Sequence, residues 1–351
     1  MLFSKKKELI GIDVGSTSIK LVQLRESKGG YEVDSMGIAA LPPEAIVDNT
    51  LMDSSAVADC IRSLVEGLAV RKVREAASSI SGNSVIIRKV QMPAATDEEL
   101  ESEILWESEQ YIPFDIQDVN VDFQILPQGD DDPSRMNVLL VASKKDIIND
   151  YQSVFAEAGL KLVVVDVDAF AVQNAFEMNY DVSPEDVFAL INIGANMMNI
   201  TVVKGGVSLF NRDVQMGGSL YTEEIQKKLG TSADEADRMK VSAGPGSSES
   251  LLEAIGKIND TIALEVRRSL DFYNSSALEG KISGLYLAGG GSKTLNLAET
   301  IGERLSLPVE IVDPFRKIKW DEKKFEPDFV AELSPIMCVA VGLAARRLGD
   351  K

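Results

Sequence analysis

The stretch LIGIDVGSTSIKLVQ at residues 9–23 decides the fold. Apolar residues lie on either side of a Gly-Ser-Thr-Ser turn, which predicts two antiparallel strands joined by a tight turn. Successive backbone N–H groups of such a turn can point at one anion, and the hydroxyls of Ser16 and Thr17 add two donors. The stretch predicts a phosphate-binding hairpin, although a plain tight turn has the same pattern.

Two charged side chains flank the turn. Asp13 precedes it, where a carboxylate would repel bare phosphate but can hold a magnesium ion through water. Lys20 follows on the second strand as a counter-charge for phosphate. The candidate phosphate site therefore comprises Asp13, Gly15, Ser16, Thr17, Ser18 and Lys20.

Later stretches extend this pattern. LINIGANMMNITVV at residues 190–203 repeats the strand, glycine turn and strand, which indicates a duplicated chain with two hairpins facing one cleft, although four matching positions can arise by chance. LYLAGGGSK at residues 285–293 is an apolar strand that runs into three glycines and a helix. Backbone there can lie flat against a bulky ligand, or the glycines can serve packing alone.

The composition excludes several classes of function. The 351 residues carry 36 Lys+Arg against 55 Asp+Glu, a formal charge of −19, which argues against nucleic-acid binding and favours basic protein partners. The chain has no histidine, which excludes Ser-His and Cys-His nucleophile pairs and imidazole zinc sites. Its two cysteines lie far apart in apolar stretches and suggest neither a disulfide framework nor a metal cluster.

The beginning of the chain bears on its location. MLFSKKK at residues 1–7 is followed by too short an apolar run for a signal peptide or a membrane span, so we expect a cytoplasmic protein. The same seven residues can touch a membrane surface, or can simply fray.

The order and content of five segments resemble the actin-like ATPase superfamily, which includes actin, the heat-shock chaperone ATPases, the sugar kinases and FtsA. They lie at residues 10–23, 166–176, 190–203, 285–301 and 333–346. The resemblance implies an α/β, actin-like and ribonuclease H-like duplicated fold, with two lobes around a nucleotide cleft. It also implies ATP or ADP with Mg²⁺ as the ligand.

The resemblance also assigns roles by position. Asp13 corresponds to the ligand of magnesium-bound water, Gly15, Ser16 and Thr17 to the β-phosphate cradle, and Lys20 to the phosphate-contacting lysine. The further nucleotide-binding positions are Gly194 and Gly218 on the γ-phosphate side, Asp237 and Lys240 at ribose and base, and Gly289, Gly290, Gly291 and Lys293 along the nucleoside. A solvated charged helix is the alternative for Asp237 and Lys240.

Two departures from the superfamily's pattern count against fast hydrolysis. Asn192 stands where most relatives have an aspartate, and Asp168, in DVDAFA at residues 166–171, stands where they have a glutamate followed by proline. A poorly oriented water should lower the rate more than the affinity. We therefore expect nucleotide binding with weak or no hydrolysis. The resemblance implies that Asp13 holds magnesium through water.

Within the superfamily, the chain resembles the PilM family of type IV pilus assembly proteins. The resemblance rests on residues 9–23, on ASSISG at 77–82, on 98–115, on DVDAFA at 166–171 and on EVRRSLDFY at 265–273. It implies an adaptor in twitching motility that binds the N-terminal cytoplasmic peptide of PilN in a groove between the first subdomain and an inserted one. The adaptor would link PilN to pilus motor ATPases or a platform protein. Membrane contact would be indirect, and self-association into a ring is left open.

The resemblance further implies an FtsA-type (SHS2) inserted αβ subdomain. Subdomain 1A is expected at residues 1–84, 163–186 and 333–351, the inserted subdomain 1C at 85–162, subdomain 2A at 187–225 and 283–332, and subdomain 2B at 226–282. The acidic face of a helix at 98–110 is a candidate surface for basic partners, with a solvated outer face as the alternative.

Three other functions stay open. A filament-forming, FtsA-like cytoskeletal ATPase is the first alternative. A sugar or small-acid kinase would need a second catalytic carboxylate, and the sequence offers no convincing one. A nucleotide-free scaffold is the last.

Overall fold

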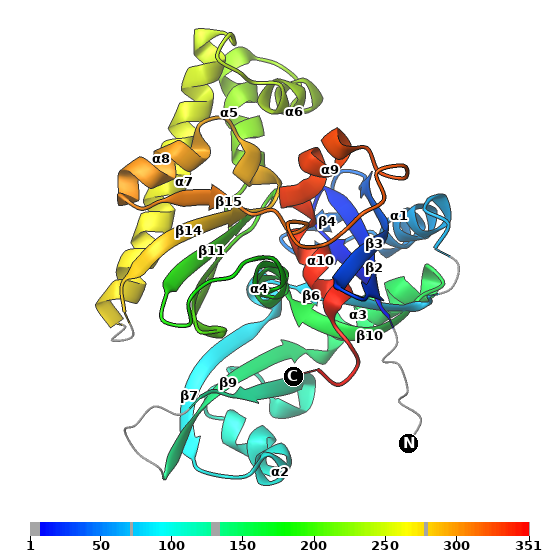
Figure 1. Cartoon of the computed structure of the whole chain (residues 1–351), viewed down its shortest axis with the longest axis vertical. Helices are drawn as coiled ribbons and strands as arrows, with labels where there is room; N and C mark the ends of the chain where they lie inside the picture. Colours follow the sequence, from blue (N-terminus) through cyan, green and yellow to red (C-terminus); the bar gives the residue numbers. More distant parts are fainter. Residues whose placement is uncertain (1–7, 71–72, 128–133, 277–279, 351) are drawn as a thin grey trace.

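The computed structural model describes residues 8–70, 73–127, 134–276 and 280–350, so MLFSKKK at residues 1–7 lies outside the described residues. Two five-stranded sheets form the two lobes (Figure 1). The first has the order β10-β6-β1-β2-β3, with β10 at Lys161–Val167, β6 at Glu75–Ile80, β1 at Ile10–Val14, β2 at Ser18–Ser27 and β3 at Gly30–Ala40. The second has the order β15-β14-β11-β12-β13, with β15 at Val309–Ile311, β14 at Ile282–Ala288, β11 at Val187–Ile193, β12 at Met198–Lys204 and β13 at Val207–Val214.

The two sheets share one topology. In each, the first strand pairs antiparallel with the second and parallel with a later strand, β6 or β14. Asp13 lies opposite Lys20 in the first hairpin, and Asn192 lies opposite Asn199 in the second. The predicted duplication is therefore confirmed, and the fold is the actin-like duplicated α/β fold.

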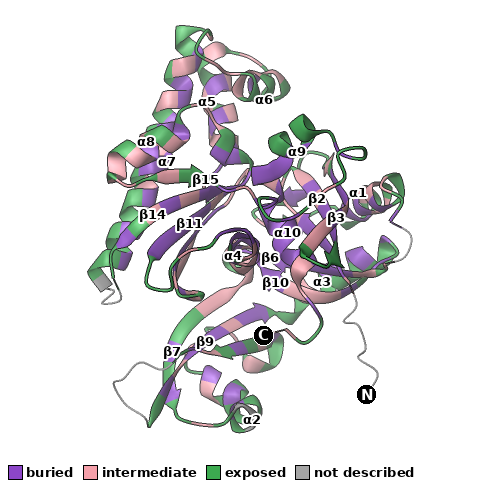
Figure 2. Ribbon diagram, in the orientation of Figure 1, coloured by how far each residue is buried: buried purple, intermediate pink, exposed green. Residues whose placement is uncertain are grey.

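Two helices cross between the sheets, near the middle of Figure 1: α4 (Asp168–Asn179) and α10 (Cys338–Ala345). One buried cluster joins them to strands of both lobes, and Figure 2 shows this central region as buried. A Cβ added to Gly342 would lie 1.8 Å from the Ala171 carbonyl oxygen, and one added to Gly11 would lie 2.2 Å from that of Ala340. The backbone of α10 therefore packs directly on α4 and on β1.

The stretch Pro327–Ala345, which includes α9 (Pro327–Leu333), η4 (Ser334–Met337) and α10, resembles a membrane span by length and composition alone. Its apolar window is 67% buried, because α10 packs against α4 and strands of the first sheet. The core accounts for its apolar character.

An inserted unit lies below the first lobe in Figure 1. It consists of the sheet β7-β9-β8, the helix α2 and the short η2, with β7 at Ile86–Pro93, α2 at Asp97–Ser108, η2 at Ile116–Asp118, β8 at Val119–Ile125 and β9 at Arg135–Lys144. A capping box of Thr96 and Glu99 begins α2, and the helix ends at Ser108, two residues before the end of the helix predicted at 98–110.

The helix after β9, α3 (Lys145–Glu157), belongs by packing to the first lobe. Its buried residues Tyr151, Val154 and Phe155 join the cluster around β1 and α1 (Ser54–Gly67), not the cluster of the inserted sheet. We therefore propose that the inserted unit ends near residue 144 rather than at 162. The other subdomain boundaries stay predictions.

The remaining elements complete the two lobes. Helices fill most of the segment between β13 and β14. The other elements are β4 at Ile46–Val47, β5 at Thr50–Leu51, η1 at Gly82–Ser84, α5 at Ser219–Leu229, α6 at Ala233–Val241, α7 at Glu249–Ser276, η3 at Gly290–Lys293 and α8 at Leu297–Leu305.

We predict that Gly342→Ala destabilises the protein by about 2 kcal/mol or more, because a methyl group there overpacks the α4–α10 crossing. Gly256→Ala on α7 is the matched control: a Cβ there meets no described atom within 4 Å, so its higher helix propensity should stabilise by up to about 1 kcal/mol. Urea denaturation measures both variants. Equal stability of the two would contradict the packing account.

Candidate functional site

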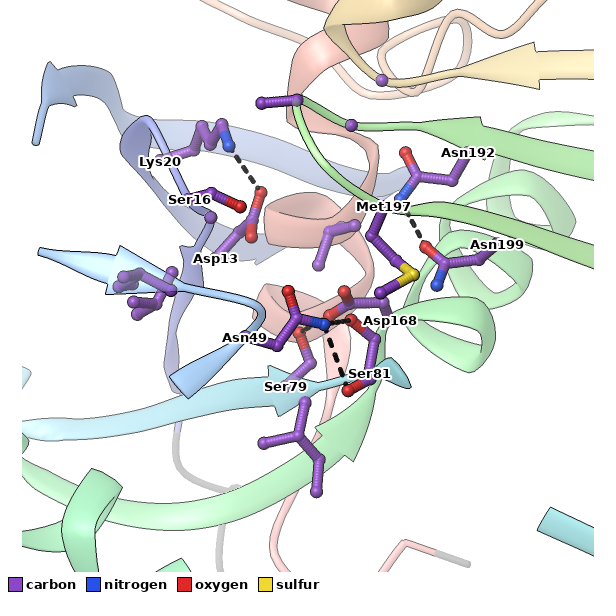
Figure 3. A pocket seen from close by; sticks show the side chains of 18 of the residues that line it. Asp13, Ser16, Lys20, Asn49, Ser79, Ser81, Asp168, Asn192, Met197 and Asn199 are labelled. Atoms are coloured by element: carbon purple, nitrogen blue, oxygen red, sulfur yellow. Dashed lines mark hydrogen bonds and ion pairs between the residues drawn. The ribbon is translucent and has the colours of Figure 1, made fainter. Parts of the chain in front are cut away.

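A cleft between the lobes collects polar residues from both halves of the chain (Figure 3). The first hairpin, the end of β6 and the start of α4 form one wall, and the second hairpin and the glycine loop after β14 form the other. Predicted site residues in its lining are Asp13, Gly15, Ser16, Thr17, Lys20, Asp168, Asn192, Gly194, Gly289 and Gly290. The two glycine turns therefore share one cavity.

In the first hairpin, the Gly15 N–H donates to the Ser18 carbonyl at 3.2 Å and closes the turn. Lys20 Nζ lies 3.2 Å from Asp13 Oδ2 and donates to the Ser18 carbonyl at 3.3 Å. A Cβ on Gly15 would lie 2.8 Å from Lys20 Nζ, so a larger residue would push the lysine away. The turn thus brings one carboxylate and one ammonium group to the cleft, and both side chains are only 13% exposed.

Asp168 is the first residue of α4, and its Oδ1 accepts a hydrogen bond from Ser79 Oγ at 2.6 Å. Burial, and next the charge of Asp13, raise the pKa of Asp168 to about 6, although the hydroxyls of Ser79 and Ser81 act in the opposite direction. Removal from water disfavours the charged carboxylate, and a second carboxylate nearby adds to that effect. The cleft therefore holds this carboxylate at an energetic cost.

The second hairpin holds its polar groups in place by local hydrogen bonds. Asn192 Nδ2 donates to Asn199 Oδ1 at 2.9 Å, and the Gly194 N–H donates to the Met197 carbonyl at 2.8 Å. The Gly194 carbonyl in turn accepts from the Gly218 N–H at 2.9 Å. The turn and the start of α5 are therefore tied together on the far side of the cleft.

The glycine loop after β14 requires glycine for steric reasons. Gly289 has φ +82°, and a Cβ there would lie 2.4 Å from the Ile193 carbonyl oxygen. A Cβ on Gly291 would lie 2.4 Å from Ile193 Cγ2. These two glycines let the loop pack on the end of β11, while Gly290 lines the cleft.

Six predicted positions lie outside the lining of the cleft: Ser18, Gly218, Asp237, Lys240, Gly291 and Lys293. Lys240 Nζ donates to Asp237 Oδ1 at 2.5 Å and to the Gly218 carbonyl at 3.4 Å, so this pair stands beside the second turn. Lys293 is exposed, and its Nζ donates to the Glu332 carbonyl at 2.8 Å. The role of each predicted site residue stays a prediction.

The sequence reasoning missed several lining residues. Ser79 lies in the buried end of β6 and Ser81 directly follows the strand, and serines at the end of a buried strand are a signal that could have found them. Asn49 comes from the tip between β4 and β5, has φ +61°, and donates to Ser81 Oγ at 3.1 Å. Asn199 lines the cleft from β12.

The donor set fits a magnesium ion held through water better than a protein cage. Among the residues that the structure describes, no group of three or more His, Cys, Asp or Glu side chains is arranged to hold a metal. Magnesium usually takes one or two carboxylates and completes its shell with waters and phosphate oxygens. Asp13, beside the glycine turn, supplies such a carboxylate.

The outer face of α2 differs from a purely acidic surface. Trp106 is 75% exposed and Leu105 46% exposed, within a run that also carries Glu103 and Glu107. Leu100 and Ile104 are buried on the opposite face against the inserted sheet. The predicted acidic helix therefore also presents an aromatic side chain.

The family model for the type IV pilus assembly protein PilM matches residues 11–348. The chain belongs to the PilM family. A solved PilM-PilN type IV pilus biogenesis complex is 28% identical, with a TM-score of 0.88, over 99% of this chain and 100% of that one.

More distant proteins share the fold of this PilM-family chain. FtsA of Bacillus subtilis (strain 168) is 23% identical over 257 residues, which cover 67% of this chain and 58% of FtsA. The chain thus spans well under two thirds of that relative's length. MreB 5 of Spiroplasma citri bound to AMPPNP has a TM-score of 0.50 and 13% identity, over 97% of this chain and 95% of that one.

We predict that Asp168→Asn stabilises the nucleotide-free protein at about pH 7.5 by on the order of 2 kcal/mol. Because the native pKa of Asp168 is raised, the contribution of this side chain to the free energy of unfolding is fully present below its unfolded pKa. That contribution is lost as pH rises through about 6. The variant has no charge to lose, and its amide oxygen can still accept from Ser79.

Urea denaturation at about pH 5 and about pH 7.5 measures this effect, and the advantage of Asp168→Asn should shrink at the lower pH. Asp150→Asn, on the exposed face of α3, is the control for removing one negative charge. An advantage that is independent of pH, or equal in the two variants, would argue against a costly buried carboxylate.

Proposed function

We propose that this PilM-family protein is an ATP-binding cytoplasmic adaptor of the type IV pilus inner-membrane complex, and that it binds the N-terminal cytoplasmic tail of PilN. The observation that carries the proposal is the whole-chain match to a PilM-PilN complex, combined with a polar cleft between two glycine hairpins.

Phosphate chemistry supports a nucleotide as the ligand. The turn at Gly15 offers backbone donors and hydroxyls, and Lys20 brings a positive charge to the same point. MreB 5, which shares the fold, was solved with AMPPNP, and this supports a nucleoside triphosphate as the class of ligand. Mg²⁺, held through water by Asp13, would neutralise phosphate charge beside the turn.

Slow hydrolysis follows from the residues around the cleft. Asn192 supplies an amide where most relatives have a carboxylate. Asp168, shorter than a glutamate by one methylene, is held by Ser79 against the wall of the first lobe. A water that is poorly oriented toward the γ-phosphate lowers the rate more than the affinity. We therefore propose that bound ATP serves as a structural ligand more than as a substrate for hydrolysis.

A tail peptide of PilN as partner is supported by the PilM-PilN complex that matches the entire chain. The formal charge of −19 favours a partner with basic residues, and the site expected from the resemblance lies between the first lobe and the inserted unit. Binding to the tail of an inner-membrane protein would hold the adaptor at the membrane without a lipid contact of its own. Pilus motor ATPases or a platform protein would be the partners on its other side.

Self-association is the second candidate function, and the similarity to FtsA favours it. In this alternative the inserted unit mediates contacts between copies in a filament or a ring. Sedimentation with MgATP over a range of protein concentrations separates the two functions: a filament pellets above a critical concentration, and a monomeric adaptor stays in the supernatant.

We predict that MgATP and MgADP both raise the Tm of the wild-type protein, because a ligand that binds only the folded state stabilises it by mass action. Asp13→Asn should lose most of this shift, since it removes the carboxylate beside the turn. Asp150→Asn, which removes one negative charge from the exposed face of α3 outside the cleft, is the control that should keep the shift. A wild-type protein that neither nucleotide stabilises would contradict nucleotide binding.

We also predict that a fluorescent peptide of the PilN cytoplasmic tail binds one site per chain, measured by fluorescence anisotropy. A scrambled peptide of the same composition should not bind if side-chain order matters. Trp106→Ala should bind the tail normally, because Trp106 projects from the outer face of α2. Equal affinity for the scrambled peptide would reduce the interaction to charge alone and contradict a specific PilN groove.

A further inference from the structure

A chain of hydrogen bonds leads from Asn192, in the second lobe, to Gly82 in the first lobe. Asn192 Nδ2 donates to Asn199 Oδ1 at 2.9 Å, as Figure 3 shows, and Asn199 Nδ2 donates to Asp213 Oδ1 at 2.8 Å. The second oxygen of Asp213 accepts from the Gly82 N–H at 2.5 Å. Asp213 and Asn199 belong to the second lobe and Gly82 to the first, so this chain of hydrogen bonds connects the two lobes.

The carboxylate of Asp213 determines which group donates and which accepts in each of these hydrogen bonds. A carboxylate only accepts hydrogen bonds, so Asn199 must turn its amide nitrogen toward it. The Asn199 oxygen then faces Asn192 and must accept from it. Asn192 is left with its own Oδ1 on the side of Gly289, 2.6 Å from where a Cβ on that glycine would lie.

Burial makes the opposite arrangement costly. Asn199 is only 3% exposed, and turning its amide over would place its oxygen against a carboxylate oxygen with no N–H between them. The Gly82 N–H holds the other carboxylate oxygen and keeps Asp213 in place. The amide orientation of Asn192 therefore depends on a residue that does not line the cleft.

We propose that Asp213 is a positioning residue that, through Asn199, presents the oxygen of Asn192 to the cleft and thereby favours a hydrated magnesium ion there over an unmetallated phosphate. An amide oxygen can bind magnesium directly or accept a hydrogen bond from a magnesium-bound water. An amide N–H would instead donate to a bare phosphate oxygen. This inference rests on the proposed function, namely that the cleft takes a magnesium nucleotide.

The near-isosteric variant D213N reverses the chain without removing a side chain. Its amide nitrogen can donate to Asn199, which then turns over and donates to Asn192, and the Asn192 N–H₂ group is released toward the cleft. The Gly82 N–H still finds an acceptor. Asn199→Ala breaks the chain instead, and Gln215→Ala is the matched control because it removes only a separate bond between the lobes, from Gln215 to Asp48.

The first readout needs no nucleotide. In protein labelled with ¹⁵N-asparagine, the side-chain amide protons of Asn192 should exchange slowly with water in the wild type and in Gln215→Ala, and rapidly in D213N and in Asn199→Ala. The Asn199 amide protons should stay protected in D213N. Slow exchange at Asn192 in D213N would overturn the proposal.

The second readout is the ratio of ATP dissociation constants in EDTA and in Mg²⁺. We expect D213N to lower this ratio roughly tenfold, the size of one hydrogen bond, with Gln215→Ala unchanged. Combining D213N with Asn199→Ala should add nothing further, because both act through one chain. A wild type that binds no nucleotide would defeat the proposed function, and the exchange measurement alone would then decide the orientation. An unchanged ratio in a D213N protein that binds ATP would overturn the magnesium preference.

Discussion

The backbone of α10 lies directly against β1 on one side and α4 on the other, and this double contact sets where the two lobes meet. Gly342 and Gly11 permit it, because a Cβ at either position would overlap a carbonyl oxygen of the neighbouring element. Helices with small residues at a crossing approach closely and gain contact along the backbone. The ends of β1 and β11, at Asp13 and Asn192, consequently line one cleft from opposite lobes.

Electrostatics in the cleft act on this frame. Asp13 is matched by Lys20, whereas Asp168 accepts hydrogen bonds from hydroxyl groups, and burial raises the pKa of Asp168 to about 6. A bound magnesium nucleotide would bring a cation and hydrogen-bond-accepting phosphate oxygens into this region. Ligand binding and the protonation of Asp168 are therefore linked. The role that we infer for Asp213 adds a further electrostatic effect. This carboxylate, which lies outside the cleft, determines which end of the Asn192 amide faces the cleft.

Local patterns in the sequence predicted most of the frame. The hairpin at residues 9–23, the repeat at 190–203 and the apolar strand that runs into three glycines at 285–293 correspond to elements of the structure, because apolar patterns report burial directly. The strand β13 was missed, since VSLFNRDV mixes apolar and polar residues along an edge of its sheet. The short hairpin of β4 and β5 was missed too, because its tip at Asp48 and Asn49 uses left-handed backbone without a glycine.

The site was predicted in part, for a similar reason. Residues next to the glycine turns were found, since a turn and its flanking charges are local in sequence. Asn199 and Asp213 were not, because their importance depends on which strands become neighbours in the second sheet. The shorter inserted unit that we propose rests on the packing of α3 against α1, and a tertiary contact of this kind cannot be read from sequence alone.

The most direct measurement is a crystal structure of the protein grown with MgAMPPNP. The account predicts nucleotide between the lobes, with its phosphates at the turn that follows Asp13, magnesium waters near Asp13 and Asn192, and the nucleoside along the glycine loop at Gly289. A nucleotide bound elsewhere, or a cleft without nucleotide at a saturating concentration, would contradict the account.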